Sequence, residues 1–185
     1  KTDYKKGFNL ESINNLDLEP KPTIYYNINK NTEWLKQKSN YKNINFTDNC
    51  SGLTHIDLSH TKITIIESEE YMNCNSIETI LLPPTLESIG AYAFYACKSL
   101  TDIDLSHTKI TIIESYTFWQ CESLETILLS PTLESIGRSS FNTCAKLKSI
   151  DLSHTKITII ENYAFIYCAK LKTILFPPTL ENIGE

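Results

Sequence analysis

The sequence is poor in the residues that build phosphate-binding and catalytic loops. Only five of its 185 residues are glycine, and three of these recur at one position of a repeat, which leaves no Gly-rich loop to cradle a phosphate. Motifs typical of nucleotide-binding proteins, serine hydrolases, zinc peptidases and EF-hand proteins are also absent. We therefore expect a protein that is not an enzyme, with no catalytic residue, no metal site and no cofactor.

The chain also lacks an excess of positive charge and a long hydrophobic run. Its net charge of −5 argues against a nucleic-acid partner, because proteins that bind nucleic acid normally carry a basic face. No run approaches the roughly 20 apolar residues needed to cross a bilayer, so we expect no membrane span. The sequence starts without Met or an apolar signal segment and stops within a repeat at "ENIGE", which predicts a piece of a longer protein.

Six cysteines occur at spacings of alternately 24 and 23 residues. Each is followed three residues later by L-x-x-I-x-L or a close variant, whose last two apolar residues have the two-residue period of a β-strand. A fixed period of about 20–29 residues with leucines in phase is typical of a leucine-rich repeat solenoid. This structural cysteine column comprises Cys50, Cys74, Cys97, Cys121, Cys144 and Cys168.

The coils alternate between two types. The phrase "DLSHTKITII" is identical at 57–66, 104–113 and 151–160, so the repeating unit is a pair of coils spanning 47 residues. The other coils carry "PPTLESIG" or a near copy, as at 83–90. There Pro ends the strand, and Gly90 is expected to allow unusual dihedral angles at a corner.

The fold class that follows is α/β: a leucine-rich repeat solenoid over residues 50–185 with one parallel β-sheet face. We expect about six coils of 23 or 24 residues, truncated at the C-terminus, with short helical or irregular return segments. In "AYAFYACKSL" a helix would place Phe94 and Cys97 on one face. The same apolar position recurs at Tyr71, Phe118, Phe141 and Phe165.

The pattern L-x-x-I-x-L-P-x-x-L-x-x-I-G-x-x-A-F-x-x-C resembles the BspA-like, or Treponema-type, leucine-rich repeats. It recurs six times over about residues 50–184, although the "SHTKITII" coils lack its Pro and Gly and contain one extra residue. The resemblance implies a cell-surface or secreted protein of a bacterium or protozoan parasite. Members of this family are implicated in adhesion to host cells, extracellular matrix and other microbes.

The cysteine column allows three interpretations. In-register side chains on stacked coils point the same way, which is poor disulfide geometry, and cysteine packs well as a small buried hydrophobe. We therefore favour free buried thiols, with a disulfide or a metal site as alternatives.

The repeated "DLSH" phrase contains Asp, Ser and His, but its spacing does not predict chemistry. His60, His107 and His154 lie two coils apart, which is about 10 Å, so they cannot share a metal whose ligands lie at about 2.0–2.1 Å. Adjacent Ser and His residues also cannot form a nucleophile–base–orienter chain with the Asp. We interpret these histidines as polar turn residues.

The outward positions of the predicted strands form the candidate ligand-binding face, as is usual for solenoids. Asp and Leu alternate at one position, and exposed leucines in line are typical of an interaction site. The twelve candidates are His55, Asp57, Thr79, Leu81, Asp102, Asp104, Thr126, Leu128, Ser149, Asp151, Thr173 and Leu175.

Three further rows of side chains recur in phase with the repeat. Ile65, Ile112 and Ile159 fill the extra place of the longer coils; they either face outward or are taken inward by a local bulge, and we favour the inward orientation. Met72, Tyr95, Trp119 and Ile166 form a return-side row that we expect to be half-buried or in contact with a neighbouring molecule. A mixed-charge edge is expected from Lys62, Lys109 and Lys156 with Glu87, Glu134 and Glu181.

Residues 1–49 do not follow the repeat and are rich in Asn and Lys. We expect an N-terminal cap containing an irregular repeat, because the first coil needs a cover for its apolar end. Asn45 and Asn49 match the N-glycosylation acceptor pattern.

We expect an extracellular or cell-surface binding module, part of a microbial adhesin, that engages a host or matrix protein or a glycan through the sheet face. The alternative is a structural surface-coat protein that self-associates through its apolar stripes.

Overall fold

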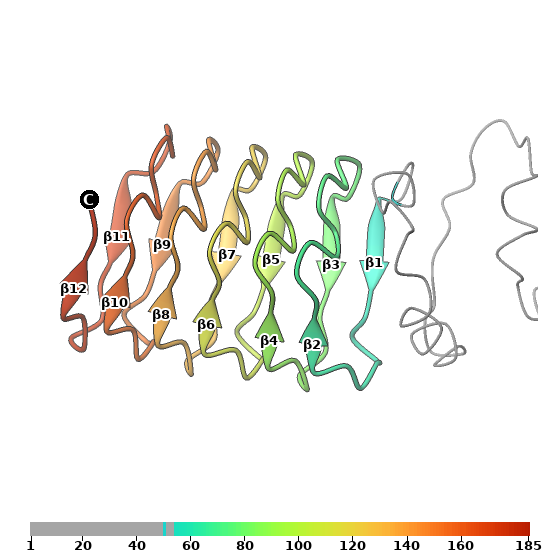
Figure 1. Cartoon of the computed structure of the whole chain (residues 1–185), viewed down its shortest axis with the longest axis horizontal. Helices are drawn as coiled ribbons and strands as arrows, with labels where there is room; N and C mark the ends of the chain where they lie inside the picture. The colour runs from blue at the N-terminus through green and yellow to red at the C-terminus, as the bar shows by residue number, and fades with distance from the viewer. Residues whose placement is uncertain (1–49, 51–53) are drawn as a thin grey trace, which may run out of the picture.

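The computed structural model describes Cys50 and residues 54–185. These residues form a solenoid whose coils follow one another along a single axis, from β1 to β12 (Figure 1). The expected N-terminal cap over residues 1–49, with Asn45 and Asn49, lies outside the described residues.

Each coil contributes two short strands, and the strands form two rows. The odd row contains β1 (His55–Asp57), β3 (Thr79–Leu81), β5 (Asp102–Asp104), β7 (Thr126–Leu128), β9 (Ser149–Asp151) and β11 (Thr173–Leu175). The even row contains β2 (Ile65–Ile66), β4 (Ser88–Ile89), β6 (Ile112–Ile113), β8 (Ser135–Ile136), β10 (Ile159–Ile160) and β12 (Asn182–Ile183). We number the coils 1 to 6, so that coil 1 contains β1 and β2.

Paired strands in both rows are parallel. The hydrogen-bonded ladders are β1-β3-β5-β7 and β9-β11 in the odd row, and β2-β4 and β6-β8-β10-β12 in the even row. The solenoid and its parallel odd row are confirmed. The prediction of a single sheet face was incomplete, because the even row was not predicted.

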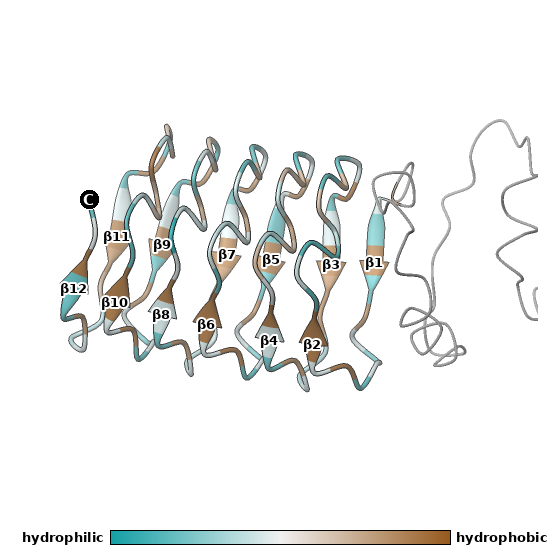
Figure 2. Ribbon diagram, viewed as in Figure 1, coloured by the Kyte–Doolittle hydropathy of each residue, from teal (hydrophilic) through white to brown (hydrophobic). Residues whose placement is uncertain are grey.

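The core lies between the two rows and uses the same positions in coils 1 to 5, whereas in coil 6 Ile174 is half-buried and Phe176 and Ile183 are exposed. The central residue of an odd strand is buried, as is the leucine that follows the strand; Ile80 and Leu82 are examples. The even row contributes the second residue of β2, β4, β6, β8 and β10, such as Ile89. Figure 2 shows these hydrophobic positions recurring at matching places along the array.

An aromatic column runs through the core along the solenoid axis. Successive ring centroids from Tyr71 through Phe94, Phe118 and Phe141 to Phe165 are 5.4, 5.5, 5.4 and 5.5 Å apart, with ring planes within 13° of parallel. Each such pair contributes about 0.5–1.5 kcal/mol beyond the area it buries. The in-phase aromatic positions of the sequence predicted this column, and it is confirmed.

The return segments contain no helix within the described part of the chain, so the helical alternative was wrong and the irregular one correct. Each segment has two residues with left-handed backbone. One lies five positions before the cysteine of the segment, and the other lies directly before it. In coil 2 these are Tyr92 (φ 58°) and Ala96 (φ 55°). The equivalent left-handed residues are Glu69, Asn73, Tyr116, Gln120, Ser139, Thr143, Tyr163 and Tyr167.

Hydrogen bonding between coils explains these dihedral angles. Alternate N–H groups close local turns, as Tyr95 N–H donates to the Tyr92 carbonyl at 3.0 Å. The groups between them donate to the next coil: Phe94 N–H to the Thr117 carbonyl at 2.9 Å and Ala96 N–H to the Trp119 carbonyl at 2.7 Å. A helix would keep all these donors within its own segment. The bonds to the next coil therefore offset the strain of non-glycine residues at positive φ.

Gly90 has a different role from the one expected. Its φ lies outside the left-handed region, but a Cβ atom on it would lie 2.4 Å from the Ser68 backbone nitrogen of the previous coil. Gly137 and Gly184 meet the preceding coil in the same way. These glycines are required by close backbone approach and not by unusual dihedral angles.

The cysteine column is present, with one correction to the expected free thiols. Cys50 and Cys74 form a disulfide, with their Cα atoms 5.2 Å apart, within the usual range for such bonds. The later cysteines are free, and each sulfur donates to a carbonyl of the preceding coil, as Cys121 Sγ does to Phe94 at 3.2 Å. The bonds from Cys97, Cys144 and Cys168 are equivalent.

We predict that unfolded, unreduced protein contains four reactive thiols and that reduction raises the count to six. In the native state, burial raises the pKa of Cys97 to about 12 and that of Cys168 to about 11. Little thiolate is then present at pH 8, so native thiols should react slowly, with the half-buried Cys168 first. Titration with a chromogenic disulfide reagent measures both states. Six thiols before reduction would contradict the disulfide.

A substitution at Thr143 (φ 61°) distinguishes the observed turns from a helix. Both Thr143→Gly and Thr143→Ala remove the side chain beyond Cβ, but only Gly relieves the left-handed strain. We expect the Gly variant to be more stable than the Ala variant by about 1 kcal/mol in urea unfolding. A helix interior would give the opposite order, with Ala favoured by about 1 kcal/mol.

Candidate functional site

The outward side of the odd row, which we call the odd face, carries all twelve residues predicted as ligand-binding candidates. One column runs through His55, Thr79, Asp102 and Thr126, and Ser149 pairs with Thr173 in the last two coils. In the other column Asp57 lies beside Leu81, Asp104 beside Leu128, and Asp151 beside Leu175. The backbone ladders therefore hold these side chains in fixed register. Their role in binding stays a prediction.

The leucine side chains of the odd face are exposed to an unusual degree for large apolar residues. Leu81 and Leu128 are each 56% exposed and Leu175 is 49% exposed, whereas the neighbouring strand residue Ile80 is 4% exposed. Three large apolar side chains in line, separated by carboxylates, form an apolar stripe that no other described residue covers.

The aspartates of this stripe are held ionised by the serine two residues later. Ser106 donates to Asp104 Oδ1 from its backbone N–H at 2.8 Å and from its hydroxyl at 2.6 Å. Asp57 and Asp151 accept the same pairs of bonds from Ser59 and Ser153. These hydrogen bonds lower the pKa of Asp57 and Asp151. At Asp104 partial burial opposes the shift, but the serine bonds still leave its pKa below the usual value.

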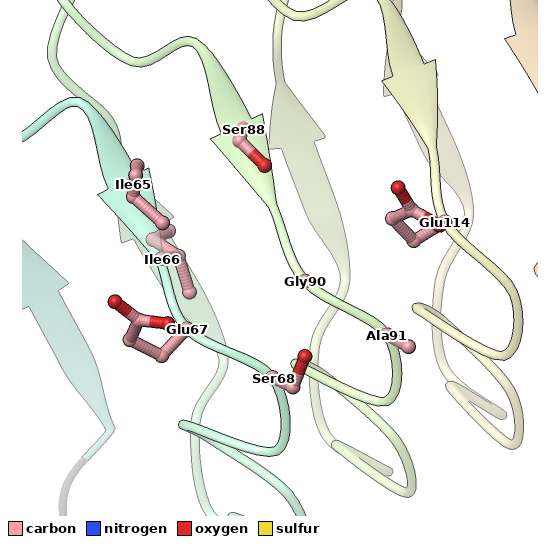
Figure 3. Close-up of a pocket in the computed structure, with 8 residues that line it drawn as sticks. All are labelled: Ile65, Ile66, Glu67, Ser68, Ser88, Gly90, Ala91 and Glu114. Carbon is pink, nitrogen blue, oxygen red and sulfur yellow. The ribbon is translucent and has the colours of Figure 1, made fainter.

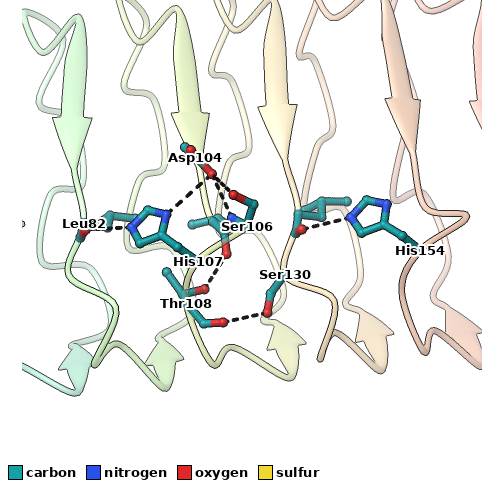
Figure 4. A network of polar contacts seen from close by, with 9 residues as sticks. Leu82, Asp104, Ser106, His107, Thr108, Ser130 and His154 are labelled. Carbon is teal, nitrogen blue, oxygen red and sulfur yellow. Dashed lines mark hydrogen bonds and ion pairs between the residues drawn. The ribbon is translucent and has the colours of Figure 1, made fainter.

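The histidines of the repeated phrase connect coils. His107 Nε2 lies 2.9 Å from the Leu82 carbonyl of the previous coil, and its Nδ1 lies 3.6 Å from Asp104 Oδ1 (Figure 4). His154 makes the equivalent contact with the Leu129 carbonyl at 3.1 Å. Because a carbonyl only accepts, Nε2 is the donor. The Ser106 hydroxyl donates to Asp104 and not to His107, so no nucleophile–base pair forms.

Ile65, Ile112 and Ile159 face outward, contrary to the inward orientation expected from the sequence. They are 52%, 44% and 42% exposed, and each is the first residue of a two-residue even strand whose second residue is buried. Ile65 is in register with Ser88, so the extra residue of the longer coils lies earlier, in the turn after Leu58. The prediction that Ile65, Ile112 and Ile159 fill the extra place was therefore wrong.

The return-side row and the mixed-charge edge lie where the sequence predicts them. Met72, Tyr95, Trp119 and Ile166 are half-buried on the return side, where Tyr95 meets Trp119 edge-on with ring centroids 5.1 Å apart. On the mixed-charge edge, Lys109 Nζ lies 3.7 Å from Glu87 Oε1. Among the described residues no group of three or more His, Cys, Asp or Glu side chains could hold a metal ion. Over the same residues, no helix has the length and hydrophobicity of a membrane span.

We predict that the Asp–Ser motif gives a stability that is lost in acid. A carboxyl whose folded-state pKa is lowered stabilises the protein above its unfolded pKa, and that contribution disappears as pH falls. The triple variant Ser59→Ala, Ser106→Ala and Ser153→Ala should be less stable than wild type at pH 7. The difference should close below the ordinary Asp pKa of about 3.9.

Urea unfolding between pH 7 and pH 3 measures this difference. A matched control replaces three in-phase serines outside the motif, Ser76, Ser99 and Ser123, with Ala. A difference in the free energy of unfolding between wild type and the motif variant that is the same at every pH would contradict the hydrogen-bonded carboxylates.

Comparison with solved structures identifies the same architecture in bacterial proteins. A leucine-rich cell surface protein of Faecalibacterium prausnitzii A2-165 is 27% identical with a TM-score of 0.61, and the match covers 66% of this chain and 31% of that protein. The present chain thus corresponds to less than a third of that relative's length.

Two further structures show the fold alone. The Treponema pallidum leucine-rich repeat protein is 20% identical with a TM-score of 0.55, over 70% of this chain and 72% of that one. A leucine-rich repeat protein of Eubacterium ventriosum is 20% identical with a TM-score of 0.57, over 67% of this chain and 33% of that one. No curated protein sequence matches at a significant level.

The family model for the BspA type leucine rich repeat region matches residues 7–119 and 90–185, in six copies. The resemblance inferred from the sequence is confirmed, and the repeated L-x-x-I-x-L phrase that carried it forms the odd row. Because the match extends over almost the whole sequence, the chain belongs to the BspA-type leucine-rich repeat family.

Proposed function

We propose that the chain is a cell-surface module that binds a protein partner through the odd face. The observation that carries this proposal is the stripe in which exposed Leu81, Leu128 and Leu175 alternate with Asp57, Asp104 and Asp151. Two columns of polar and apolar side chains locked in register form a rigid, preorganised surface, which reduces the entropy lost on binding. The description of the F. prausnitzii relative as a cell surface protein supports the location.

The spacing of the leucines suggests the shape of the partner. Leucines two coils apart are separated by about 9.6 Å, twice the interstrand distance. A chain in polyproline II conformation advances about 9.3 Å every three residues, so its every third side chain could meet successive leucines. The aspartates between the leucines favour a partner with Lys or Arg near its apolar side chains. Collagen chains have the polyproline II conformation, and we propose that the module acts in adhesion to an extracellular matrix that contains such chains.

Binding to immobilised matrix proteins, with a collagen-type triple-helical peptide in the panel, tests this function. The triple variant Leu81→Ser, Leu128→Ser and Leu175→Ser should weaken binding at least tenfold. Full burial of a single Leu contributes about 1.5–3 kcal/mol, and about 1.4 kcal/mol corresponds to tenfold in affinity.

The matched control is the variant Ile65→Ser, Ile112→Ser and Ile159→Ser on the even row, which removes three side chains of similar exposure. It should bind like wild type. Equal binding by the leucine variant and wild type would exclude the odd face as the binding surface.

A further inference from the structure

The outward side of the even row, the even face, has ridges and grooves with a period of two coils. In coils 1, 3 and 5 the outward strand residue is isoleucine, and in coils 2, 4 and 6 the register partner is smaller: Ser88, Ser135 and Asn182. Two residues further on, a glutamate in each odd-numbered coil alternates with a glycine in each even-numbered coil. Ridges therefore lie over β2, β6 and β10, and grooves over β4, β8 and β12.

A hollow of about 300 Å³ lies over β4, and Figure 3 shows the residues that line it. Ile65 and Glu67 line it from coil 1, Ser88 and Gly90 from coil 2, and Glu114 from coil 3. The close approach of the preceding coil forbids a side chain at Gly90. The backbone packing that stabilises the solenoid thus also keeps this groove open.

We propose that two copies of this chain associate face to face through their even faces, about a two-fold axis parallel to the strands. This operation keeps the strands of the two copies parallel and reverses the order of the coils. With the axis between β6 and β8, coils 1, 3 and 5 of one copy face coils 6, 4 and 2 of the other. Every ridge then faces a groove, and the interface is closed and self-complementary.

Side-chain size is complementary along the whole face. Ile112 faces Ser135 of the second copy, Ile65 faces Asn182, and Ile159 faces Ser88. The glutamates after the ridges face glycines. The other two-fold arrangement, with its axis along the solenoid, would place isoleucine on isoleucine and groove on groove, and is therefore disfavoured.

The charges favour the same arrangement at the edge where the even strands begin. Lys109 faces Thr132 in coil 4 of the second copy. Glu134 lies two residues after Thr132 in the same coil, within reach of the long lysine side chain. The same relation joins Lys62 to Glu181 and Lys156 to Glu87. At the opposite edge, Glu67, Glu114 and Glu161 interleave with the same carboxylates of the second copy, which weakens the association.

The size of the face sets the expected affinity. Six coils at about 4.8 Å and six residues at about 3.3 Å span roughly 29 by 20 Å, or about 580 Å² per copy. Stable interfaces typically bury about 800 Å² per partner. We therefore expect a weak, concentration-dependent dimer, which must be measured up to about 1 mM protein.

Sedimentation velocity of the 185-residue chain over this concentration range is the first test. Wild type should shift from monomer towards dimer, and Ile65→Ser with Ile112→Ser and Ile159→Ser should weaken the dimer at least tenfold. The leucine-to-serine triple variant of the odd face, with three side chains of similar exposure, should dimerise like wild type. All six substituted residues are exposed, and circular dichroism checks that the variants fold.

Charge variants test the geometry. Changing Lys62, Lys109 and Lys156 to Glu, or Glu87, Glu134 and Glu181 to Lys, should abolish each homodimer, and mixing the two variants should give a heterodimer. Changing Glu67, Glu114 and Glu161 to Gln should tighten the wild-type dimer.

A wild-type chain that stays monomeric at 1 mM overturns the proposal. So does a dimer that survives the isoleucine variant or is lost in the leucine variant, which would assign self-association to the odd face. Absence of a heterodimer on mixing would overturn the two-fold arrangement. Binding of a matrix protein is measured separately, so either proposal can fail without the other.

Discussion

The structure depends on hydrogen bonds and side-chain contacts between one coil and the next. Along the return segments of coils 1 to 4 every second backbone N–H group donates to the next coil, and the buried side chains pack against their equivalents in the neighbouring coils, as in the aromatic column. A single coil of 23 or 24 residues leaves these donors and its apolar core exposed to water. Stability is therefore a sum over neighbouring coils, and residues at matching phase become neighbours in space.

This constraint decides what could be predicted from the sequence. The cysteine spacing and the L-x-x-I-x-L phase predicted the solenoid, the odd strands, the aromatic column and the outward residues of the odd face. These features depend only on period and on strand alternation, which the sequence shows directly.

The errors arose where the neighbouring coil decides the local conformation. Nothing in the type of Tyr92 or Ala96 indicates a left-handed residue, because the requirement comes from a hydrogen bond to the following coil. Gly90 shows the converse, since it is required by the position of Ser68 and not by its own dihedral angles. The orientation of Ile65 depended on placing one inserted residue, and the regular spacing of the six cysteines does not distinguish the Cys50–Cys74 pair from the free thiols.

The two-coil repeat also gives the molecule two different faces. On the odd face the alternation of Asp and Leu leaves an open apolar stripe with fixed negative charges, suited to a foreign partner. On the even face the alternation of Ile and Glu with small residues gives ridges and grooves, through which we propose that a second copy associates. A BspA-type array with these two faces could bind a partner on one side while it pairs on the other.

Removal of one complete repeat unit tests the central claim most directly. Deletion of residues 104–150 joins Ile103 to Asp151, and the sequence across the junction is the same as that of residues 101–113. The remaining coils therefore keep their register. We expect a folded protein with a cooperative urea transition, a smaller m-value because less surface is buried, and a lower free energy of unfolding. A shortened chain that does not fold, or one with unchanged stability and m-value, would contradict a solenoid held together by its neighbouring coils.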